Sequence, residues 1–190
     1  MPRTIATHQI LDAALDVITK RGYAGATTRE MAAAAGINEV TLFRRFGSKK
    51  GVLMAAVEQE AGKLSAGGMT YSGDLQADLL RVVRFYQQLM AQHGRLLVML
   101  LSEAPRQPEL LEAMQTPLAI IEKIEVLIRR YQREGVLVEE PPGQAFAALV
   151  GPLFLCGALG ELVPALMETP FDPVAHVHGY LQGRLKASLS

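Results

Sequence analysis

Apolar residues recur at intervals of three and four along most of this 190-residue chain, and glycine, proline and helix-capping residues separate one run from the next. No stretch shows the alternation of a half-buried strand, and no internal repeat stands out. The pattern predicts an all-α fold of about nine helices.

The clearest local pattern begins at Thr27. Thr27 and Glu30 have the spacing of a capping box, in which each side chain binds a free backbone amide of the other residue. A helix is therefore expected to begin near Thr28. Gly36 can adopt left-handed backbone geometry without a steric penalty, so the helix should end there after about two turns. Its apolar stripe is Met31, Ala32 and Ala35.

A second short helix should follow this turn. Asn38 is a good N-cap, and Gly47 is placed to end the helix about two turns later. The apolar positions expected to carry this helix are Val40, Leu42, Phe43 and Phe46. The segment therefore predicts a helix-turn-helix.

Polar side chains crowd the start and one flank of the second helix. Arginine can bind guanine or phosphate through two hydrogen bonds, and threonine can contact a phosphate or a thymine methyl group. These side chains would suit a DNA groove, whereas the alternative is the ordinary solvated face that most charged runs on helices form. They are Asn38, Glu39, Thr41, Arg44 and Arg45.

The residues after Gly47 favour the DNA interpretation. Ser48 can cap a following helix, which places Lys49 and Lys50 in its first turn. There the helix dipole disfavours each cation by roughly 0.3 to 1 kcal/mol. A DNA phosphate bound at this helix start would offset that cost and would also use the free backbone amides.

With the segment that precedes it, this region resembles the N-terminal domain of the tetracycline-repressor (TetR/AcrR) family of bacterial transcription regulators. The resemblance covers about residues 8–57 and is carried, in order, by TT at Thr27, AG at Gly36, TLFRRF at Thr41 and SKK at Ser48. The DNA contacts that it implies are Thr28, Arg29, Asn38, Glu39, Thr41, Phe43, Arg44, Arg45 and Lys49.

Two residues depart from the commoner family pattern. Phe43 stands where the family often has tyrosine, so a hydroxyl contact to phosphate is missing. Glu39 sets a carboxylate close to the DNA backbone. It could accept a hydrogen bond from cytosine N4, or it could be a first-turn acid that suits the helix dipole.

Charge is distributed unevenly, although the whole chain has 19 basic and 19 acidic residues. Residues 1–51 hold eight Lys and Arg against four Asp and Glu, and the rest of the chain has the opposite imbalance. Positive charge therefore sits where nucleic acid would bind, and a neutral whole-chain charge is no objection to DNA binding.

Further helices are expected after Ser48. Asp74 can cap a long helix, which Gly94 can interrupt. The expected ranges are Lys49 to about Leu64, Leu75 to Gly94, Arg95 to Glu103, one or two turns from Pro108, Pro117 (after a Thr116 cap) to Gly135, Gln144 to about Met167, and Val174 to Leu189. We expect residues 1–48 to form the DNA-binding domain, 49–64 a connecting helix, and 65–190 an effector-binding and dimerisation domain.

The last two helices are apolar around much of their circumference, so something must cover them. They either pack only within one subunit or pair with those of a second. The family resemblance favours a homodimer with a four-helix interface, which would present two recognition helices to successive major grooves of a roughly palindromic operator. The predicted seam residues are Phe146, Leu149, Val150, Leu153, Gly157, Val177, Tyr180, Leu181 and Arg184.

The middle helices carry apolar and adaptable side chains that could line a small-molecule pocket, although an ordinary core would explain each of them singly. Their sparse charge predicts an apolar or aromatic effector. The resemblance implies that this ligand moves the helix starting at Lys49 and alters the spacing of the two DNA-reading heads. The candidates are Phe85, Tyr86, Leu89, Met90, His93, Met99, Met114, Leu118, Ile121 and Phe154.

Other features bound the function. The single cysteine, Cys156, excludes an internal disulfide and fits a reducing compartment. The first ten residues lack the apolar core of a signal peptide, so we expect a cytoplasmic protein. Residues 141–160 carry no charge over nearly the length of a membrane span, but glycines and Pro152 interrupt them. We expect a buried helix there and no membrane segment.

An enzyme is not expected, and neither a metal nor a cofactor is. The four histidines are scattered, and no glycine-rich phosphate loop, cysteine cluster or nucleophile elbow is present. The sequence predicts a DNA-binding transcriptional regulator, by family analogy a repressor released from its operator by a small ligand. The alternatives are a helical ligand- or partner-binding protein without DNA binding, and an enzyme whose pocket forms only in three dimensions.

Overall fold

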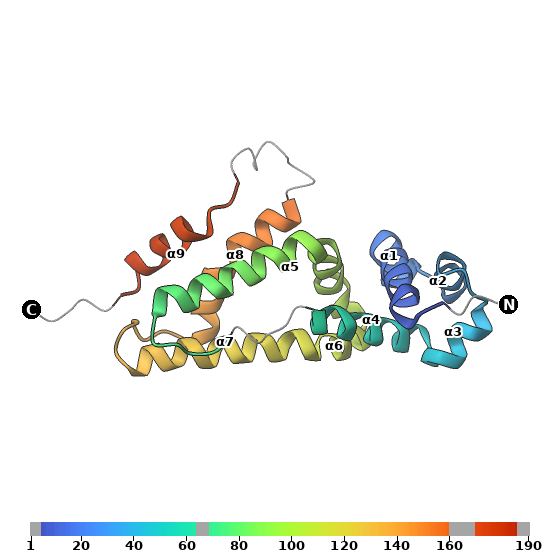
Figure 1. Ribbon diagram of the computed structural model, residues 1–190, viewed down its shortest axis with the longest axis horizontal. Helices are drawn as coiled ribbons and strands as arrows, with labels where there is room; N and C mark the ends of the chain where they lie inside the picture. Colours follow the sequence, from blue (N-terminus) through green and yellow to red (C-terminus); the bar gives the residue numbers. More distant parts are fainter. Residues whose placement is uncertain (1–4, 64–68, 160–169, 186–190) are drawn as a thin grey trace, which may run out of the picture. The chain divides into compact units, whose positions relative to one another are not determined.

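The chain is all-helical in the computed structural model, which describes residues 5–63, 69–159 and 170–185. Within these residues it forms nine α-helices and one short 3-10 helix, which confirms the predicted fold class (Figure 1). They are α1 (Thr7–Gly25), α2 (Thr28–Ala34), α3 (Glu39–Phe46), α4 (Lys49–Lys63), α5 (Leu75–Glu103), η2 (Ala104–Arg106), α6 (Pro108–Ala113), α7 (Gln115–Arg133), α8 (Pro142–Leu159) and α9 (Pro173–Gln182).

The helices form two compact units. The first contains α1 to α4 together with the end of α5 from Arg95, η2 and α6. The second contains α5 up to Gly94, α7 from Leu118, α8 and α9. The functional division of the chain at residues 48 and 65 remains a prediction.

The core of the first unit is built from two distant parts of the sequence. Met31 of α2 and Leu42 of α3 are buried against α1 and α4. Leu100 and Leu110, which follow more than 50 residues later, enter the same core and are at most 1% exposed. The helix-turn-helix therefore depends on α5 and α6 for part of its hydrophobic interior.

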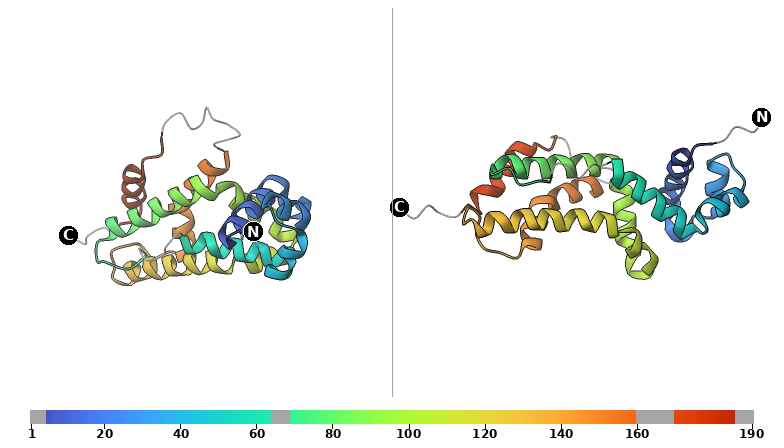
Figure 2. Two further views of the ribbon diagram at one scale, coloured as in Figure 1. Left: turned by 45° about the vertical axis from the view of Figure 1, so that its right-hand side comes forward. Right: turned by 60° about the horizontal axis from the view of Figure 1, so that its bottom comes forward.

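The second unit has its own core, in which α5, α7 and α8 lie along one another (Figures 1 and 2). Helix α9 packs on α8. The core includes Tyr86 of α5, Ile124 of α7, Leu149 of α8 and Val177 of α9, each at most 3% exposed. The helix expected to begin at Gln144 is present as α8 and has a buried face. No helix in the described part of the chain could cross a membrane.

Several predicted helix ends are confirmed by the hydrogen bonds that make them. The Asp74 carboxylate accepts from the Ala77 amide at 2.9 Å, at the start of α5. The Asp172 carboxylate caps α9 by accepting from the amides of Val174 and Ala175. Gly135 has a φ of 72° just after α7, as a helix-ending glycine requires.

The predicted break at Gly94 is wrong, because α5 runs without interruption from Leu75 to Glu103. Glycine inside a helix costs only about 1 kcal/mol relative to alanine. Gly94 is buried, and a Cβ there would lie 3.7 Å from the carbonyl oxygen of Gly157 on α8. Gly94 therefore lies in contact with α8, and its burial in this packing offsets the cost.

Other ends differ by a few residues. Helix α7 begins at Gln115, so Thr116 and Pro117 lie in its first turn. Helix α9 ends at Gln182 rather than Leu189, and the following Arg184 carbonyl accepts from the Val138 amide at 2.9 Å. The expected extensions to Leu64, to Met167 and through residues 186–189 lie outside the described residues.

A buried carboxylate ties α5 to α7 in the second unit. The Asp78 side chain has no exposed surface and accepts hydrogen bonds from the Tyr131 hydroxyl at 2.6 Å and from the Ser72 amide at 2.9 Å. It also accepts from the Ser72 hydroxyl and from Arg81. Burial by itself would raise the pKa of Asp78. The hydrogen bonds from these donors lower the pKa by more, so it lies below its ordinary value.

We predict that Asp78→Ala lowers the free energy of unfolding by about 3 kcal/mol, because it leaves the buried Tyr131 hydroxyl without the carboxylate that accepts from it and removes the ion pair with Arg81. A lowered folded-state pKa stabilises the fold above the unfolded pKa of about 4, so the difference from wild type should shrink below about pH 4. Urea denaturation from pH 3 to 8 measures it. Asp16→Ala, which removes an exposed pair with Lys20, should cost under about 1 kcal/mol.

Candidate nucleic-acid interface

The start of α2 has the predicted capping box. The Glu30 amide donates to Thr27 Oγ1 at 3.2 Å, and the Thr27 amide donates back to Glu30 Oε2 at 3.0 Å. The Thr27 hydroxyl also donates to Glu30 Oε2 at 2.9 Å, and the hydrogen bonds from this hydroxyl and from the Thr27 amide lower the pKa of the Glu30 carboxyl. The reciprocal bonds fix the direction in which α2 leaves α1.

The turn between α2 and α3 is set by Gly36. This glycine has a φ of 67°, and the next amide, that of Ile37, donates to the Ala32 carbonyl at 3.0 Å. Such a reversal ends α2 within one residue and is open to glycine at little cost. Asn38 then caps α3 by accepting from the Thr41 amide at 2.7 Å. The predicted helix-turn-helix is therefore present.

Glu39 joins the two helices of the motif. The Thr28 hydroxyl donates to Glu39 Oε1 at 2.5 Å, and both residues are half-buried. The sequence left two roles open for Glu39, a contact to cytosine and a first-turn acid. In this structure its carboxylate is hydrogen-bonded to the other helix, which aligns the starts of α2 and α3.

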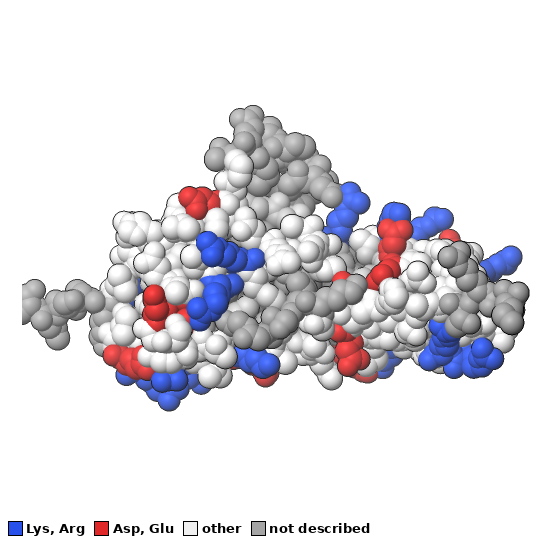
Figure 3. Space-filling view, viewed as in Figure 1, with Lys and Arg blue, Asp and Glu red and all other residues white. Residues whose placement is uncertain are grey.

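The outer face of α3 is more apolar than the sequence suggested. Of the four apolar positions expected to carry the helix, Leu42 is buried, whereas Val40 is 75% and Phe43 is 45% exposed. Leu42 and the partly buried Phe46 pack against the core of the first unit, whereas Val40 and Phe43 face outward. Arg44 is exposed beside them, and Figure 3 shows Lys and Arg side chains gathered over α3, at the lower right of that face.

The remaining predicted contacts fall into two groups. Arg29 is exposed and Thr41 is half-buried. Arg45 is exposed, but its Nη1 donates to the Ile5 carbonyl at 3.1 Å, so it holds the segment that leads into α1. A short local pattern could not reveal that bond, because it joins residues 40 positions apart.

Lys49 lies at the start of α4, where Ser48 forms the predicted cap by accepting from the Gly51 amide at 3.0 Å. The Lys49 side chain turns back toward α1. Its Nζ lies 3.4 Å from the Ala24 carbonyl oxygen and 4.4 Å from the centre of the Tyr23 ring. Burial lowers the pKa of the ammonium group, against the opposing charges of Glu103 and Glu109.

The candidate effector residues are divided between the two units. Met99 and Met114 lie in the core of the first, whereas Tyr86, Phe154 and the other members of the set belong to the second. The Tyr86 and Phe154 rings are 6.0 Å apart, and burial raises the pKa of Tyr86. Leu118 is 44% exposed. Their role in binding a ligand remains a prediction.

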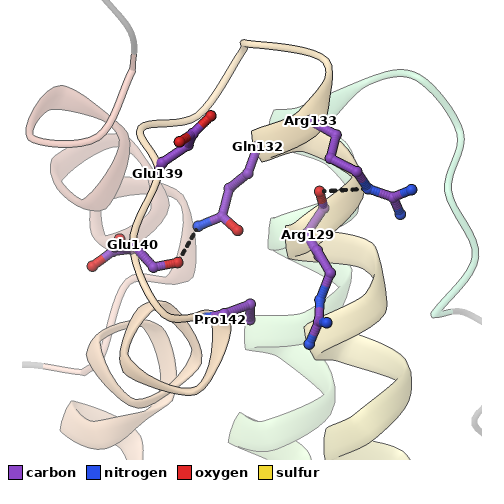
Figure 4. Close-up of a pocket in the computed structure, with 6 residues that line it drawn as sticks. All are labelled: Arg129, Gln132, Arg133, Glu139, Glu140 and Pro142. Carbon is purple, nitrogen blue, oxygen red and sulfur yellow. Dashed lines mark hydrogen bonds between the residues drawn. The ribbon is translucent and has the colours of Figure 1, made fainter.

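A surface hollow of about 300 Å³ lies elsewhere in the second unit, between the end of α7 and the start of α8 (Figure 4). None of the ten candidate effector residues lines it. In the close-up its two arginine side chains point in different directions, and the Gln132 amide donates to the Glu140 carbonyl. The lining residues are Arg129, Gln132, Arg133, Glu139, Glu140 and Pro142.

Most of the residues predicted for the dimer seam are covered within the single chain. Seven of them are under 9% exposed within the single chain, and Gly157 faces Met90 of α5. Arg184 pairs with Glu140 at 2.7 Å within the same chain. The seven buried side chains belong to the core of the second unit, and their role in a dimer remains a prediction. The seven are Phe146, Leu149, Val150, Leu153, Val177, Tyr180 and Leu181.

Residues 10–56 match the family described as "Bacterial regulatory proteins, tetR family". A Bacillus subtilis (strain 168) protein, the uncharacterized HTH-type transcriptional regulator YvkB, is 38% identical over 74 residues. The matched stretch covers 39% of this chain and 39% of that relative, so it spans about two fifths of the length of the curated relative.

Two solved structures share the fold over nearly the whole chain. The fatty acid degradation regulator FadR from Bacillus halodurans has a TM-score of 0.67 at 22% identity, covering 96% of this chain and 95% of its own. The flavonoid-responsive regulator FrrA has a TM-score of 0.65 at 18% identity, covering 96% and 98%. At residues 10–56 the chain therefore carries a helix-turn-helix domain that matches the tetR family of bacterial regulatory proteins, a family of transcription regulators and not of enzymes.

Proposed function

We propose that this protein is a sequence-specific DNA-binding transcriptional regulator that acts as a homodimeric repressor and is released from a palindromic operator by a small apolar or aromatic ligand. The observation that carries DNA binding is the outer face of α3. A helix fixed at both ends presents Val40, Phe43 and Arg44 to the outside, with Arg29 exposed at the start of α2. Two exposed apolar side chains beside a cation do not stabilise a protein surface that binds no partner.

Two alternatives make different demands on these residues. In a helical protein that binds only ligands or partners, Arg29 and Arg44 would have no role in binding. The family argues against an enzyme.

We predict that selection of bound duplexes from a random pool recovers a palindromic motif. The affinity for this motif should fall steeply with salt concentration, because each helix-turn-helix domain neutralises several phosphates. Arg44→Ala should weaken the free energy of binding to the selected duplex by about 1 to 3 kcal/mol, and it should reduce the preference for one base at one position of the motif. Lys49→Ala should weaken binding to all duplexes alike. Fluorescence anisotropy from 50 to 300 mM salt measures both, and Arg129→Ala, on α7, is the matched loss of an exposed cation. A folded protein that enriches no motif would refute the regulator.

Val40 gives the recognition helix a specific chemistry. Its branched apolar side chain is the most exposed large apolar group of the described chain, and it lies on the turn of α3 next to the Asn38 cap. In the major groove, the apolar group available to such a side chain is the thymine methyl. We therefore assign Val40 to thymine recognition within the proposed operator.

We predict that replacing one thymine of each half-site by uracil, which removes only a methyl group, weakens binding of the wild type several-fold. Val40→Ala should weaken binding to the thymine duplex and should make the protein insensitive to the same replacement. A double-mutant cycle of protein and base measures this coupling by anisotropy. Equal sensitivity of both proteins at every thymine would remove Val40 from base recognition.

The effector proposal rests on the aromatic cluster of the second unit. Tyr86 packs edge-on against Phe85 and Phe146, with ring centres 5.3 and 5.6 Å apart, and Phe154 lies on its other side. An apolar ligand could replace some of these contacts without burying a charge. To release DNA, the ligand must bind more tightly to the dimer in which the two helix-turn-helix domains are displaced, since equal affinity for both states leaves DNA binding unchanged. The fold neighbour FrrA is described as flavonoid-responsive, which is an aromatic class.

The dimer surface that we propose is the outer side of α8 and α9. The buried residues of these helices face inward, and their exposed neighbours form a stripe at helical spacing. Leu155 and Val174, at 59% and 46% exposure, are its largest apolar members. The stripe comprises Ala147, Pro152, Leu155, Val174, Ala175, His178, Gly179 and Gln182.

We predict that the wild type sediments as a dimer at micromolar concentration and that Leu155→Asp weakens the dimer at least tenfold, because it buries an unpaired charge. The same substitution at Val126, which is 60% exposed on α7, is the control and should leave the dimer intact. Analytical ultracentrifugation distinguishes the two. A wild-type monomer, or equal effects of both variants, would contradict this surface.

A further inference from the structure

The two lysines in the first turn of α4 are not left free for DNA. Residues of the first unit that come after Arg95 supply three carboxylates around them, those of Glu103, Glu109 and Glu112. These three residues and the two lysines belong to the same compact unit.

Lys50 is held by a direct ion pair. Its Nζ lies 2.5 Å from Glu112 Oε2, and the two side chains are 37% and 51% exposed. An exposed pair of this kind is worth about 0.2 to 1 kcal/mol, so a stronger anion can break it. A phosphate approaching the start of α4 would be such an anion.

Lys49 is held less directly. Its ammonium group lies over the Tyr23 ring, and the charges of Glu103 and Glu109 favour it there. Burial raises the pKa of the Tyr23 hydroxyl, and the nearby negative charge of Glu109 raises it further.

Glu103 fixes the place of this cluster. Its two carboxylate oxygens accept from the amides of Tyr23 and Ala24, both at 3.2 Å. A Cβ on Gly22, whose φ is 75°, would lie 2.6 Å from Glu103 Oε1, so glycine at this position makes room for the carboxylate. The end of α1 is thus bound to the end of α5, and Lys49 sits beside that bond.

We propose, resting on the function proposed above, that Glu112 competes with DNA phosphates for Lys50 and so lowers the affinity of the helix-turn-helix domain for DNA. The Lys50 ammonium group cannot bind a carboxylate and a phosphate equally well at the same time. DNA binding must therefore exchange the carboxylate for the phosphate, and the free energy of the internal ion pair is subtracted from that of binding. Glu112 is a positioning residue, since it acts through Lys50 and need not touch DNA.

The test measures binding of the full-length protein to a random-sequence duplex by anisotropy at several salt concentrations. Glu112→Gln should tighten binding about two- to fivefold at low salt, the size expected from losing an exposed pair. The released Lys50 should make the salt slope steeper by up to about 0.9. Glutamine can still accept a hydrogen bond, so the substitution removes the charge and keeps the shape of the side chain.

The control is Glu58→Gln, which removes an exposed carboxylate from α4 itself, two turns beyond Lys50. It should leave affinity and salt slope unchanged. A gain equal to that of Glu112→Gln would mean that the acids only repel DNA at long range, which would overturn the proposal.

A double-mutant cycle separates competition from every other effect. In a Lys50→Ala background, Glu112→Gln should lose its two- to fivefold gain, because no lysine remains to be released. A gain that persists there, or no gain in the wild-type background, would contradict competition while leaving DNA binding intact. Failure of the folded wild type to bind any duplex would instead refute the proposed function. Urea midpoints of all variants verify that the fold is retained.

Discussion

Burial of Leu100 and Leu110 among α1 to α4 is the contact on which the arrangement of the DNA-binding surface depends. Helices as short as α2 and α3, with seven and eight residues, are not stable alone and persist because a core holds them. Part of that core comes from α5 and α6, which lie outside the helix-turn-helix in sequence. Truncating a fully buried leucine to alanine costs about 2 to 5 kcal/mol, a large part of a typical domain's stability. The core that holds the helix-turn-helix is therefore built from two distant segments of the sequence. A displacement of α5 or α6 would disturb the packing of α3 and α4.

Polar contacts refine what this core positions. The caps at Thr27, Asn38 and Ser48 fix three successive helix starts, and the bond from Thr28 to Glu39 aligns two of them. These bonds use short side chains whose partners are three residues away or on the adjoining helix, so little conformational freedom remains to be lost on binding. The long side chains of the head differ in this respect. Arg44 extends outward, whereas Lys49 and Lys50 contact groups of their own unit. Affinity for a polyanion then reflects competition among anions as well as the number of cations.

The second unit is built on a different balance. Its largest apolar side chains interlock around Tyr86 and Tyr131, and a single ionised group, Asp78, is enclosed with enough donors to keep its charge. A buried carboxylate of this kind selects one register of α5 against α7, since any shift would strand it without partners. The close approach of Gly94 to Gly157 does the same for α5 and α8. Together they give the unit a defined geometry around its aromatic cluster.

The sequence by itself determined the features that rest on neighbours in the chain. The capping box at Thr27, the turn at Gly36, the cap at Asn38 and the cap at Asp172 were all predicted, because each is a bond or a backbone angle within three or four residues. Only the tertiary structure decided which side of an apolar helix faces inward. It turned Val40 and Phe43 outward, carried α5 through Gly94, and buried Leu153 and Tyr180 inside the subunit. Those outcomes depend on residues that are far apart in sequence and meet only after the chain has packed.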